Sequence, residues 1–228
     1  MRLTYHGHSC FLAEAGGKSV IIDPFLTGNP TAVAKPEEIQ VDAVLVTHGH
    51  SDHLGDSIEI AKRNNAPIIA PFELAMYCSQ KGAPVHPMHL GGAHQFEFGR
   101  VKLTIAFHGS AVVAEEEGIV YTGNPCGFLL TMQGKTFYHA GDTALFGDMR
   151  LIGEFAKIDV AALPIGDNFT MGLDDAVIAA KWVGAKKVIP MHYSTFPLIE
   201  QDAAAFAARL QPAGIEGVVL KAGESIEV

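Results

Sequence analysis

A short apolar run followed at once by a cluster of histidines and aspartates is the feature that most limits how this chain can fold. Residues 45–56 read LVTHGHSDHLGD, and Val44 begins the apolar run. A β-branched run of this length predicts a buried strand, so residues 48–53 are expected to leave its end as a loop. Loops at strand ends often carry functional residues. The sequence therefore predicts a site at the edge of a sheet.

The composition is typical of a folded α/β core. The chain has 228 residues, of which 48% are hydrophobic and 18% charged, so it can bury most of its apolar surface in one domain spanning residues 1–228. The formal net charge is −9, whereas non-specific nucleic-acid binding requires an excess of basic residues on the surface. We therefore expect a small-molecule substrate and no nucleic-acid partner.

Cysteine usage and hydropathy indicate where the protein works. Cys10, Cys78 and Cys126 lack CxxC spacing, which favours a reducing compartment without disulfides. Cys10 and Cys126 are interpreted as small buried side chains rather than nucleophiles. No apolar run approaches the length of a membrane span, and the first residues lack a long apolar signal segment. We expect a cytoplasmic protein without membrane association, and the sequence leaves open whether it forms homo-oligomers.

Strand and helix signals alternate along the chain. Strands are expected at residues 2–5, 10–14, 20–23, 44–46, 68–70, 101–107, 127–132, 136–139, 160–163, 188–191 and 217–220, and helices at 57–64, 73–81, 149–157, 174–183 and 202–210. Each half of the chain has strands first and helices after. This order predicts an α/β fold in which two sheets pack face to face with helices outside.

The residue types in the 48–53 segment suit a transition-metal site. Imidazole and carboxylate are ligands for zinc, manganese or iron. The i, i+2 spacing points His48 and His50 the same way, so Asp52 and His53 face a second position. One alternative is a polar loop whose histidines cap a helix or pair with carboxylates. Another is a mononuclear structural site, which the absence of closely spaced cysteines disfavours.

Further candidate ligands also follow apolar extended runs. His108 follows LTIAF, Asp142 follows TFYHAG and His192 follows KKVIPM, so four strand ends are expected to meet at one rim. The histidines of the connection PVHPMHLGGAHQF are expected to be solvated or packed. His139 lies within a strand, where a supporting or core role is expected.

The order and spacing of these motifs resemble the metallo-β-lactamase superfamily across nearly the whole chain. The motifs are THGHSDH, His108, GDT at residues 141–143 and MHY at residues 191–193. The resemblance implies a four-layer αββα sandwich with two divalent metal ions at the rim between the sheets. Zn²⁺ is the expected metal, and Mn²⁺ and Fe²⁺ are the alternatives. The segments YHGHSCFL and GDNFTMG look further like the branch of small bacterial metal-dependent hydrolases related to L-ascorbate-6-phosphate lactonase.

The resemblance also implies a role for each candidate ligand. One ion would be held by His48, His50 and His108, and the other by Asp52, His53 and His192. Asp142 would bridge the two, because a carboxylate has two oxygens that can serve both cations. His8 in the GHS segment is left open as an additional ligand, a substrate contact or a histidine hydrogen-bonded in a loop. The branch often has His-Ser-Ser where this chain has a glycine after His108.

The implied activity is hydrolysis by a metal-bound hydroxide that attacks an ester, lactone or phosphoester bond. Asp52 and Asp142 are the expected catalytic residues: Asp52 orients the hydroxide, and Asp142 or a metal-bound water passes a proton to the leaving group. Asn168 is expected near the rim, either as a substrate contact or as a turn-stabilising side chain. The alternatives are an iron-dependent oxidoreductase of the same superfamily similar to persulfide dioxygenase, a nuclease, which would need a basic arm, and a non-catalytic metal-binding module.

Overall fold

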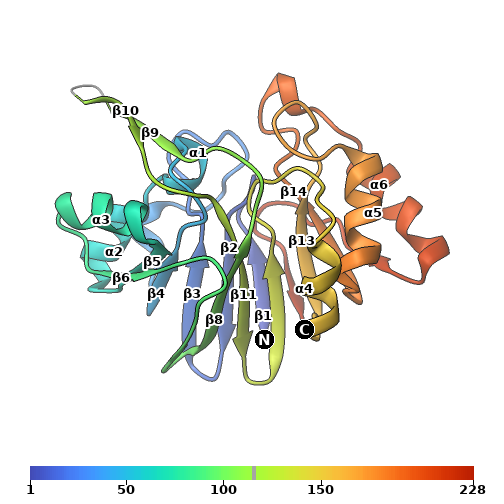
Figure 1. Ribbon diagram of the computed structural model, residues 1–228, viewed down its shortest axis with the longest axis horizontal. Helices are drawn as coiled ribbons and strands as arrows, with labels where there is room; N and C mark the ends of the chain where they lie inside the picture. Colours follow the sequence, from blue (N-terminus) through green and yellow to red (C-terminus); the bar gives the residue numbers. More distant parts are fainter. Residues whose placement is uncertain (115–116) are drawn as a thin grey trace.

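Two seven-stranded sheets carry most of the chain. The structure is a computed structural model that describes residues 1–114 and 117–228. The strand order is β16-β1-β2-β3-β4-β5-β6 in the first sheet and β15-β14-β13-β12-β11-β8-β7 in the second. Helices α2 and α3 pack against β4 to β6, and α5 and α6 pack against β13 to β15, on opposite sides of the molecule (Figure 1). This arrangement confirms the predicted four-layer α/β sandwich.

The first sheet consists of β1 (Arg2–Tyr5), β2 (Phe11–Ala15), β3 (Lys18–Ile22), β4 (Ala43–Leu45), β5 (Ile68–Pro71), β6 (Val85–Met88) and β16 (Ser225–Glu227). The second consists of β7 (Ala93–Phe96), β8 (Gly99–Ile105), β11 (Cys126–Met132), β12 (Lys135–His139), β13 (Val160–Pro164), β14 (Lys187–Met191) and β15 (Glu216–Gly217). Strands β9 (Ala111–Ala114) and β10 (Gly118–Tyr121) form a separate hairpin. The α-helices are α1 (Ser51–Leu54), α2 (Ser57–Asn64), α3 (Phe72–Gln80), α4 (Met149–Phe155), α5 (Leu173–Val183) and α6 (Ala203–Leu210).

The apolar run that opened the sequence analysis is buried on both faces of its sheet. Leu45 is fully buried in the large apolar cluster between the two sheets. Val44 and Val46 point the other way and are fully buried in a second apolar cluster that includes residues of α2 and α3. Burying both faces explains why the run lacks the alternation of polar and apolar residues that a half-exposed strand shows. The strand is therefore a rigid base for the residues that follow it.

Three sequence-based expectations are wrong in detail. Residues 48–53 are not loop throughout, because the short helix α1 begins at Ser51. The PVHPMHLGGAHQF connection forms the edge strands β6 and β7. Pro87 and the histidines interrupt the apolar pattern that would predict these strands, and an edge strand tolerates a proline that a central strand excludes. The strand expected at residues 217–220 ends at Gly217.

Other elements had no signal in the sequence. The β9–β10 hairpin and β16 were not expected, and β16 pairs with β1 although more than 200 residues separate them. Among the described residues, no helix has the length and apolar character needed to cross a membrane.

Candidate metal centre

The candidate ligands follow four strands whose ends meet at one rim. His48 and His50 come after β4, His108 after β8, Asp142 after β12 and His192 after β14. Strands β12, β13 and β14 are parallel, and β8 runs in the same direction because both β8 and β12 are antiparallel to β11. Their carboxyl ends therefore lie at the same edge of the second sheet, as the sequence predicts.

The first donor group consists of His48, His50 and His108, and one ring nitrogen of each lies within 4.8 Å of the others. His50 Nδ1 is 3.0 Å from His48 Nε2 and 3.3 Å from His108 Nε2. His48 is fully buried, and its Nδ1 lies 2.9 Å from Thr47 Oγ1, which fixes the orientation of the ring. The His48 and His50 side chains converge, as their i, i+2 spacing predicts.

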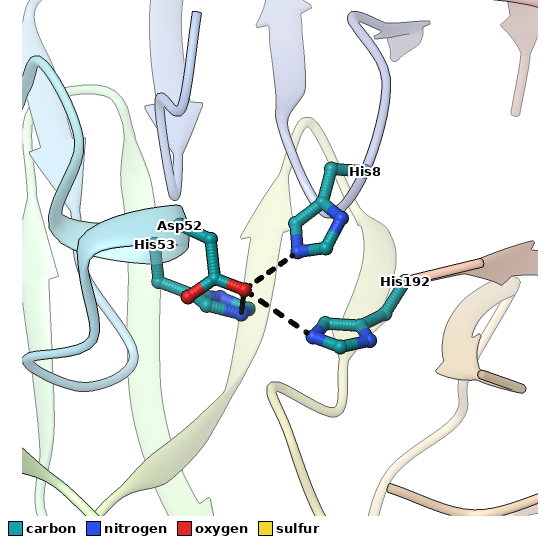
Figure 2. A group of neighbouring side chains, drawn as sticks. All are labelled: His8, Asp52, His53 and His192. Atoms are coloured by element: carbon teal, nitrogen blue, oxygen red, sulfur yellow. Dashed lines mark hydrogen bonds and ion pairs between the residues drawn. The ribbon is translucent and has the colours of Figure 1, made fainter. Parts of the chain in front are cut away.

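The second donor group consists of His8, Asp52, His53 and His192 (Figure 2). Asp52 lies at its centre. Its Oδ2 is 3.0 Å from His8 Nε2, 3.6 Å from His192 Nε2 and 4.0 Å from His53 Nε2. The structure therefore brings the three residues predicted for a second ion together, and it adds His8 to them.

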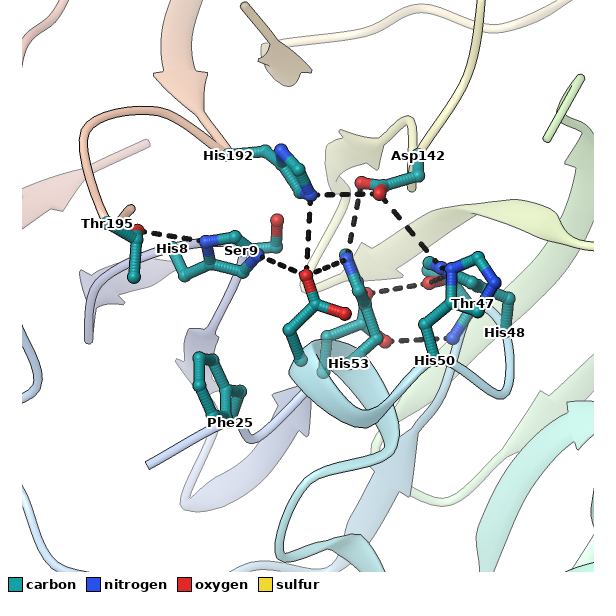
Figure 3. A network of polar contacts seen from close by, with 12 residues as sticks. His8, Ser9, Phe25, Thr47, His48, His50, His53, Asp142, His192 and Thr195 are labelled. Atoms are coloured by element: carbon teal, nitrogen blue, oxygen red, sulfur yellow. Dashed lines mark hydrogen bonds and ion pairs between the residues drawn. The ribbon is translucent and has the colours of Figure 1, made fainter. Parts of the chain in front are cut away.

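Asp142 lies between the two groups and is 2% exposed (Figure 3). Its Oδ1 is 3.3 Å from His53 Nε2, and its Oδ2 is 2.9 Å from His192 Nε2. The same Oδ2 is 3.6 Å from His108 Nε2 and 4.0 Å from His48 Nε2. One carboxylate thus reaches two residues of each group.

Burial and the two carboxylates set the charge of this cluster. Burial lowers the pKa of His48, His50 and His108, so these imidazoles are neutral and keep a lone pair. Burial also opposes protonation of His192, but the Asp142 and Asp52 carboxylates outweigh it and raise the pKa of His192 to about 9.

The same contacts keep the carboxylates ionised. Burial alone would raise the pKa of Asp142, but His192 and His53 outweigh it and hold that pKa well below the usual range. The pKa of Asp52 is likewise lowered by His53, His192 and His8 against the effect of burial. The carboxylates and the imidazoles of His48, His50 and His108 are therefore in the protonation state that metal ligands need, whereas the raised pKa values of His53 and His192 mean that these two rings carry a proton that a bound cation would displace.

His8 is fixed from several sides. Its Nδ1 is 2.9 Å from Thr195 Oγ1, its carbonyl accepts from Tyr5 Oη at 3.1 Å and from the His192 amide at 2.8 Å, and its ring lies 4.2 Å from that of His192. Burial lowers the pKa of His8 to about 4, so the ring is neutral. Because the Asp52 carboxylate only accepts, His8 donates from Nε2, and Nδ1 accepts from the Thr195 hydroxyl.

Asp23 is the buried residue of this region that the sequence analysis missed. It directly follows β3 and is 0% exposed. Its Oδ2 accepts from His53 Nδ1 at 2.7 Å and from Thr47 Oγ1 at 2.7 Å, while its Oδ1 accepts from the Thr47 amide at 2.8 Å. The carboxylate thereby fixes which nitrogen of His53 faces the cluster. A charged residue immediately after the apolar run VII was the signal that could have identified it.

The remaining sequence candidates lie around the cluster. His139 Nε2 donates to the Ser9 carbonyl at 2.8 Å, and its Nδ1 accepts from the Gly141 amide at 3.2 Å. These contacts agree with the supporting or core role expected for it, because Gly141 precedes Asp142. Asn168 is exposed in the loop after β13, and that loop is tied to the cluster through the Met171 amide, which donates to the Thr143 carbonyl at 3.1 Å.

The donor atoms fit a bound cation. His53 Nε2 and Asp142 Oδ1 are buried 3.3 Å apart, but neither has a well-formed hydrogen bond among the described residues. In the first group, three ring nitrogens face one another across 3.0 and 3.3 Å. Lone pairs that converge on one point are stabilised by a positive charge, and imidazole and carboxylate together suit zinc, manganese or iron.

Comparisons with known proteins agree with this geometry. The model of the β-lactamase superfamily domain matches residues 2–192. A UPF0173 metal-dependent hydrolase of Bacillus cereus (strain B4264) is 60% identical over 227 residues, which are 99% of each chain.

Solved structures share the fold. A metallo hydrolase from the hyperthermophilic archaeon Ignicoccus hospitalis KIN4/I superposes with a TM-score of 0.89 at 36% identity, covering 99% of this chain and 97% of its own. An isothiocyanate hydrolase from Delia radicum gut bacteria has a TM-score of 0.78 at 20% identity, over 100% and 99% of the two chains, which is a likeness of fold. The link to L-ascorbate-6-phosphate lactonase stays a prediction. On the family match and the 60% identity, the chain belongs to the metallo-β-lactamase superfamily and, within it, to the UPF0173 metal-dependent hydrolases.

Proposed function

We propose that the rim cluster holds two divalent metal ions and that the protein hydrolyses an ester, lactone or phosphoester bond of a small molecule. The position of Asp142 carries this proposal. Its two oxygens lie 3.3 Å from His53 and 3.6 Å from His108, which belong to different donor groups. A carboxylate between two sets of nitrogen donors is suited to bridging two cations.

The proposed ligands follow the two groups. One ion is assigned to His48, His50 and His108, the other to Asp52, His53 and His192, with Asp142 shared. Zn²⁺ is the first choice, and Mn²⁺ or Fe²⁺ suits the same residue types. When bound, such a pair of ions lowers the pKa of a water molecule towards neutrality and stabilises the negative charge that develops on the substrate oxygen.

Asp52 is proposed to orient the attacking water. It is the more accessible of the two acids, with a side chain that is 26% exposed against 2% for Asp142. His8 and His192 lie on its Oδ2, so among the described residues Oδ1 has no hydrogen-bond partner and can accept a hydrogen bond from the water. The proton for the leaving group is proposed to come from Asp142 or from a water molecule in the site.

His8 is proposed to position Asp52 rather than to act directly. Both of its ring nitrogens already have partners, Asp52 on Nε2 and Thr195 on Nδ1. Phe25 and Phe196 lie edge-on to the His8 ring at 5.6 and 5.7 Å. Because Phe196 is 38% exposed, we propose that it offers an apolar wall to a substrate approaching Asp52, with Asn168 as a polar contact on the loop after β13.

The test combines metal analysis with an activity screen. The protein is stripped with a chelator, reloaded with zinc or manganese and analysed for bound metal, and lactones, esters, thioesters and phosphodiesters are then offered as substrates. We expect up to two ions per chain and a hydrolytic activity that is lost on chelation and restored by metal. An Asp142→Asn variant should lose both the second ion and the activity, whereas the exposed Asp148→Asn variant should keep them.

Two results would overturn this proposal. A protein that never binds more than one ion would require a mononuclear site. Oxygen consumption with a persulfide substrate by the iron-loaded protein, without hydrolysis of any compound in the panel, would favour an oxidoreductase.

Other features bear on how the protein works in the cell. Cys10, Cys78 and Cys126 are free and buried, which supports a reducing, cytoplasmic location. Strand β16 pairs with β1, which supports residues 1–228 acting as one domain. The net charge of −9 supports a small-molecule substrate rather than a nucleic acid. Light scattering on the metal-loaded protein measures whether copies of the chain associate.

A further inference from the structure

A second cavity lies away from the metal centre, on the outer face of the second sheet. Its volume is about 720 Å³, and its floor is formed by β8, β11 and β12. Residues of helix α4, which is labelled in Figure 1, and the turn at Leu90 and Gly91 also line the cavity. The lining residues include none of the candidate metal ligands. The volume falls within the range of small-molecule sites, about 300–1,000 Å³.

The strand register shows that the cavity has a polar end. Arg100 on β8 pairs with Thr131 on β11, and Thr131 in turn pairs with Thr136 on β12. The two threonine hydroxyls are 3.0 Å apart. Lys157, which follows α4, lines the same cavity two residues before Asp159, whose amide donates to the Thr136 carbonyl. A guanidinium, an ammonium and two hydroxyls therefore gather at one end.

The opposite end is mainly apolar, with Asp148 before the start of α4 as its acidic residue. Ile105, five residues further along β8, pairs with Cys126 rather than with Thr131, which places it about 16 Å from Arg100 at the usual rise per strand residue. Phe146 and Leu151 line this part of the cavity, and Phe146 packs on Phe107 with ring centroids 5.2 Å apart. Ile105 and Leu151 are 42% and 48% exposed, so apolar surface is left open to a ligand.

The charges of the cavity are not balanced by the protein. Arg100, Lys102 and Lys157 line it, and within the described residues none of the three forms an ion pair with another side chain. Asp148 is the acidic residue among the lining residues. A group of unpaired cations is unexpected in a chain with 25 acidic and 16 basic residues. It favours a negatively charged ligand.

We propose that this cavity binds an amphipathic carboxylate, a molecule with one anionic head and an unbranched apolar tail. The head lies between Arg100 and Lys157. One of the Thr131 and Thr136 hydroxyls donates to the other, and the remaining O–H donates to the head, while the tail runs along Leu129 towards Ile105. Guanidinium and carboxylate make strong paired hydrogen bonds, and burial of the tail removes apolar surface of Ile105 and Leu151 from water. The proposal goes beyond the hydrolase activity, because it concerns a separate site that requires neither metal nor catalysis.

Decanoate is the probe for this proposal. It is titrated into the metal-loaded protein by isothermal calorimetry, and we expect saturable binding of one molecule per chain that weakens as salt is raised, because the cations are exposed. Arg100→Glu should weaken binding about tenfold, since it turns an attraction at the head group into a repulsion. Leu151→Asp should have a similar effect through the tail. The matched controls are Lys221→Glu and Val33→Asp, which change exposed residues outside the cavity and should bind like the parent.

Three outcomes would overturn the proposal. Absence of binding would show that the cavity does not take this ligand. Binding that survives Arg100→Glu but is lost in Asp142→Asn would place decanoate at the metal centre. Light scattering that reveals an oligomer dissociated by Leu151→Asp, without decanoate binding, would make the cavity an interface between copies of the chain. Because the readout is binding at a separate site, failure here leaves the proposed hydrolase activity standing, and the reverse also holds.

Discussion

Replacing Asp23 by asparagine is the most informative single change near the metal centre. Asp23 does not belong to either donor group, so the substitution leaves every proposed ligand in place. Its carboxylate accepts three hydrogen bonds, from the Thr47 amide, the Thr47 hydroxyl and His53 Nδ1, all at 2.7 to 2.8 Å. The amide group of asparagine has one acceptor oxygen, so its nitrogen must face at least one of these donors.

Two effects follow in Asp23→Asn. A buried donor left without an acceptor costs about 1–3 kcal/mol of unfolding free energy, and Asp23 is 0% exposed. Loss of the partner that orients a ligating histidine typically lowers metal affinity by about 10- to 100-fold. Even where the amide oxygen still accepts from His53 Nδ1, the uncharged group makes a weaker hydrogen bond than the carboxylate does, so His53 Nε2 is held less firmly towards Asp142, 3.3 Å away.

The assay measures metal affinity by competition with a chromophoric chelator, and stability by chemical denaturation of the metal-free protein. Asp42→Asn is the matched control, because Asp42 also accepts a backbone hydrogen bond, from the Ser19 amide, but lies at the surface beside Lys18. We expect Asp42→Asn to bind metal like the parent. Metal affinity of Asp23→Asn within twofold of the parent would refute the argument that Asp23 holds His53 in its ligating orientation.

Four further predictions concern the cluster itself. Asp52→Ala should lower hydrolysis by orders of magnitude without unfolding the chain, since Asp52 lies in a partly exposed rim segment; unchanged turnover in the folded, metal-loaded variant would exclude Asp52 from the reaction. His8→Ala should lower metal affinity about 10-fold or more while His8→Gln restores part of it, because glutamine can still donate to Asp52; equal affinities of the two variants would argue against a positioning role. Cys10→Ala and Cys126→Ala should keep a chelator-sensitive activity and lose only about 1–3 kcal/mol of stability, and an activity abolished by either change would point to a thiol nucleophile. Metal binding at pH 7 should release protons, because the pKa of His192 is raised to about 9 in the metal-free protein; affinity should then fall about tenfold per pH unit below this pKa for each proton released, and calorimetry in buffers of different ionisation enthalpy measures that number.

The convergence of the candidate ligands was predictable because the ends of buried strands can be recognised in the sequence. His108, Asp142 and His192 each follow an apolar run, and the β12 to β14 strands are parallel, so their carboxyl ends had to share an edge. The run at Val44 was equally clear, since burial on both faces leaves no polar residue inside the strand. The local pattern of apolar runs and the parallel order of the strands therefore both placed the candidate ligands at one rim.

The edge strands escaped prediction for the opposite reason. Strands β6 and β7 lie at the ends of the two sheets, where one side of the strand has no neighbour and polar residues are tolerated. His86 and His94 therefore carry no hydrophobic alternation, although their rings pack at 4.6 Å across the edge of the sandwich. Such contacts are decided by the partner strand, which a local window of sequence cannot include.

His8 and Asp23 show a different limit. Both have positive φ, +56° and +47°, a conformation that residues other than glycine adopt rarely and at an energetic cost. In each case the contacts around the residue hold it there: Asp23 accepts three hydrogen bonds, and His8 is bound through both ring nitrogens and its carbonyl oxygen. These partners come from distant segments, among them Thr47 for Asp23 and Thr195 for His8, so the strain and its compensation become visible only when the rim is assembled. Because the strained residues contact His53 and Asp52, the strain supports a role for Asp23 and His8 in holding those two side chains in place.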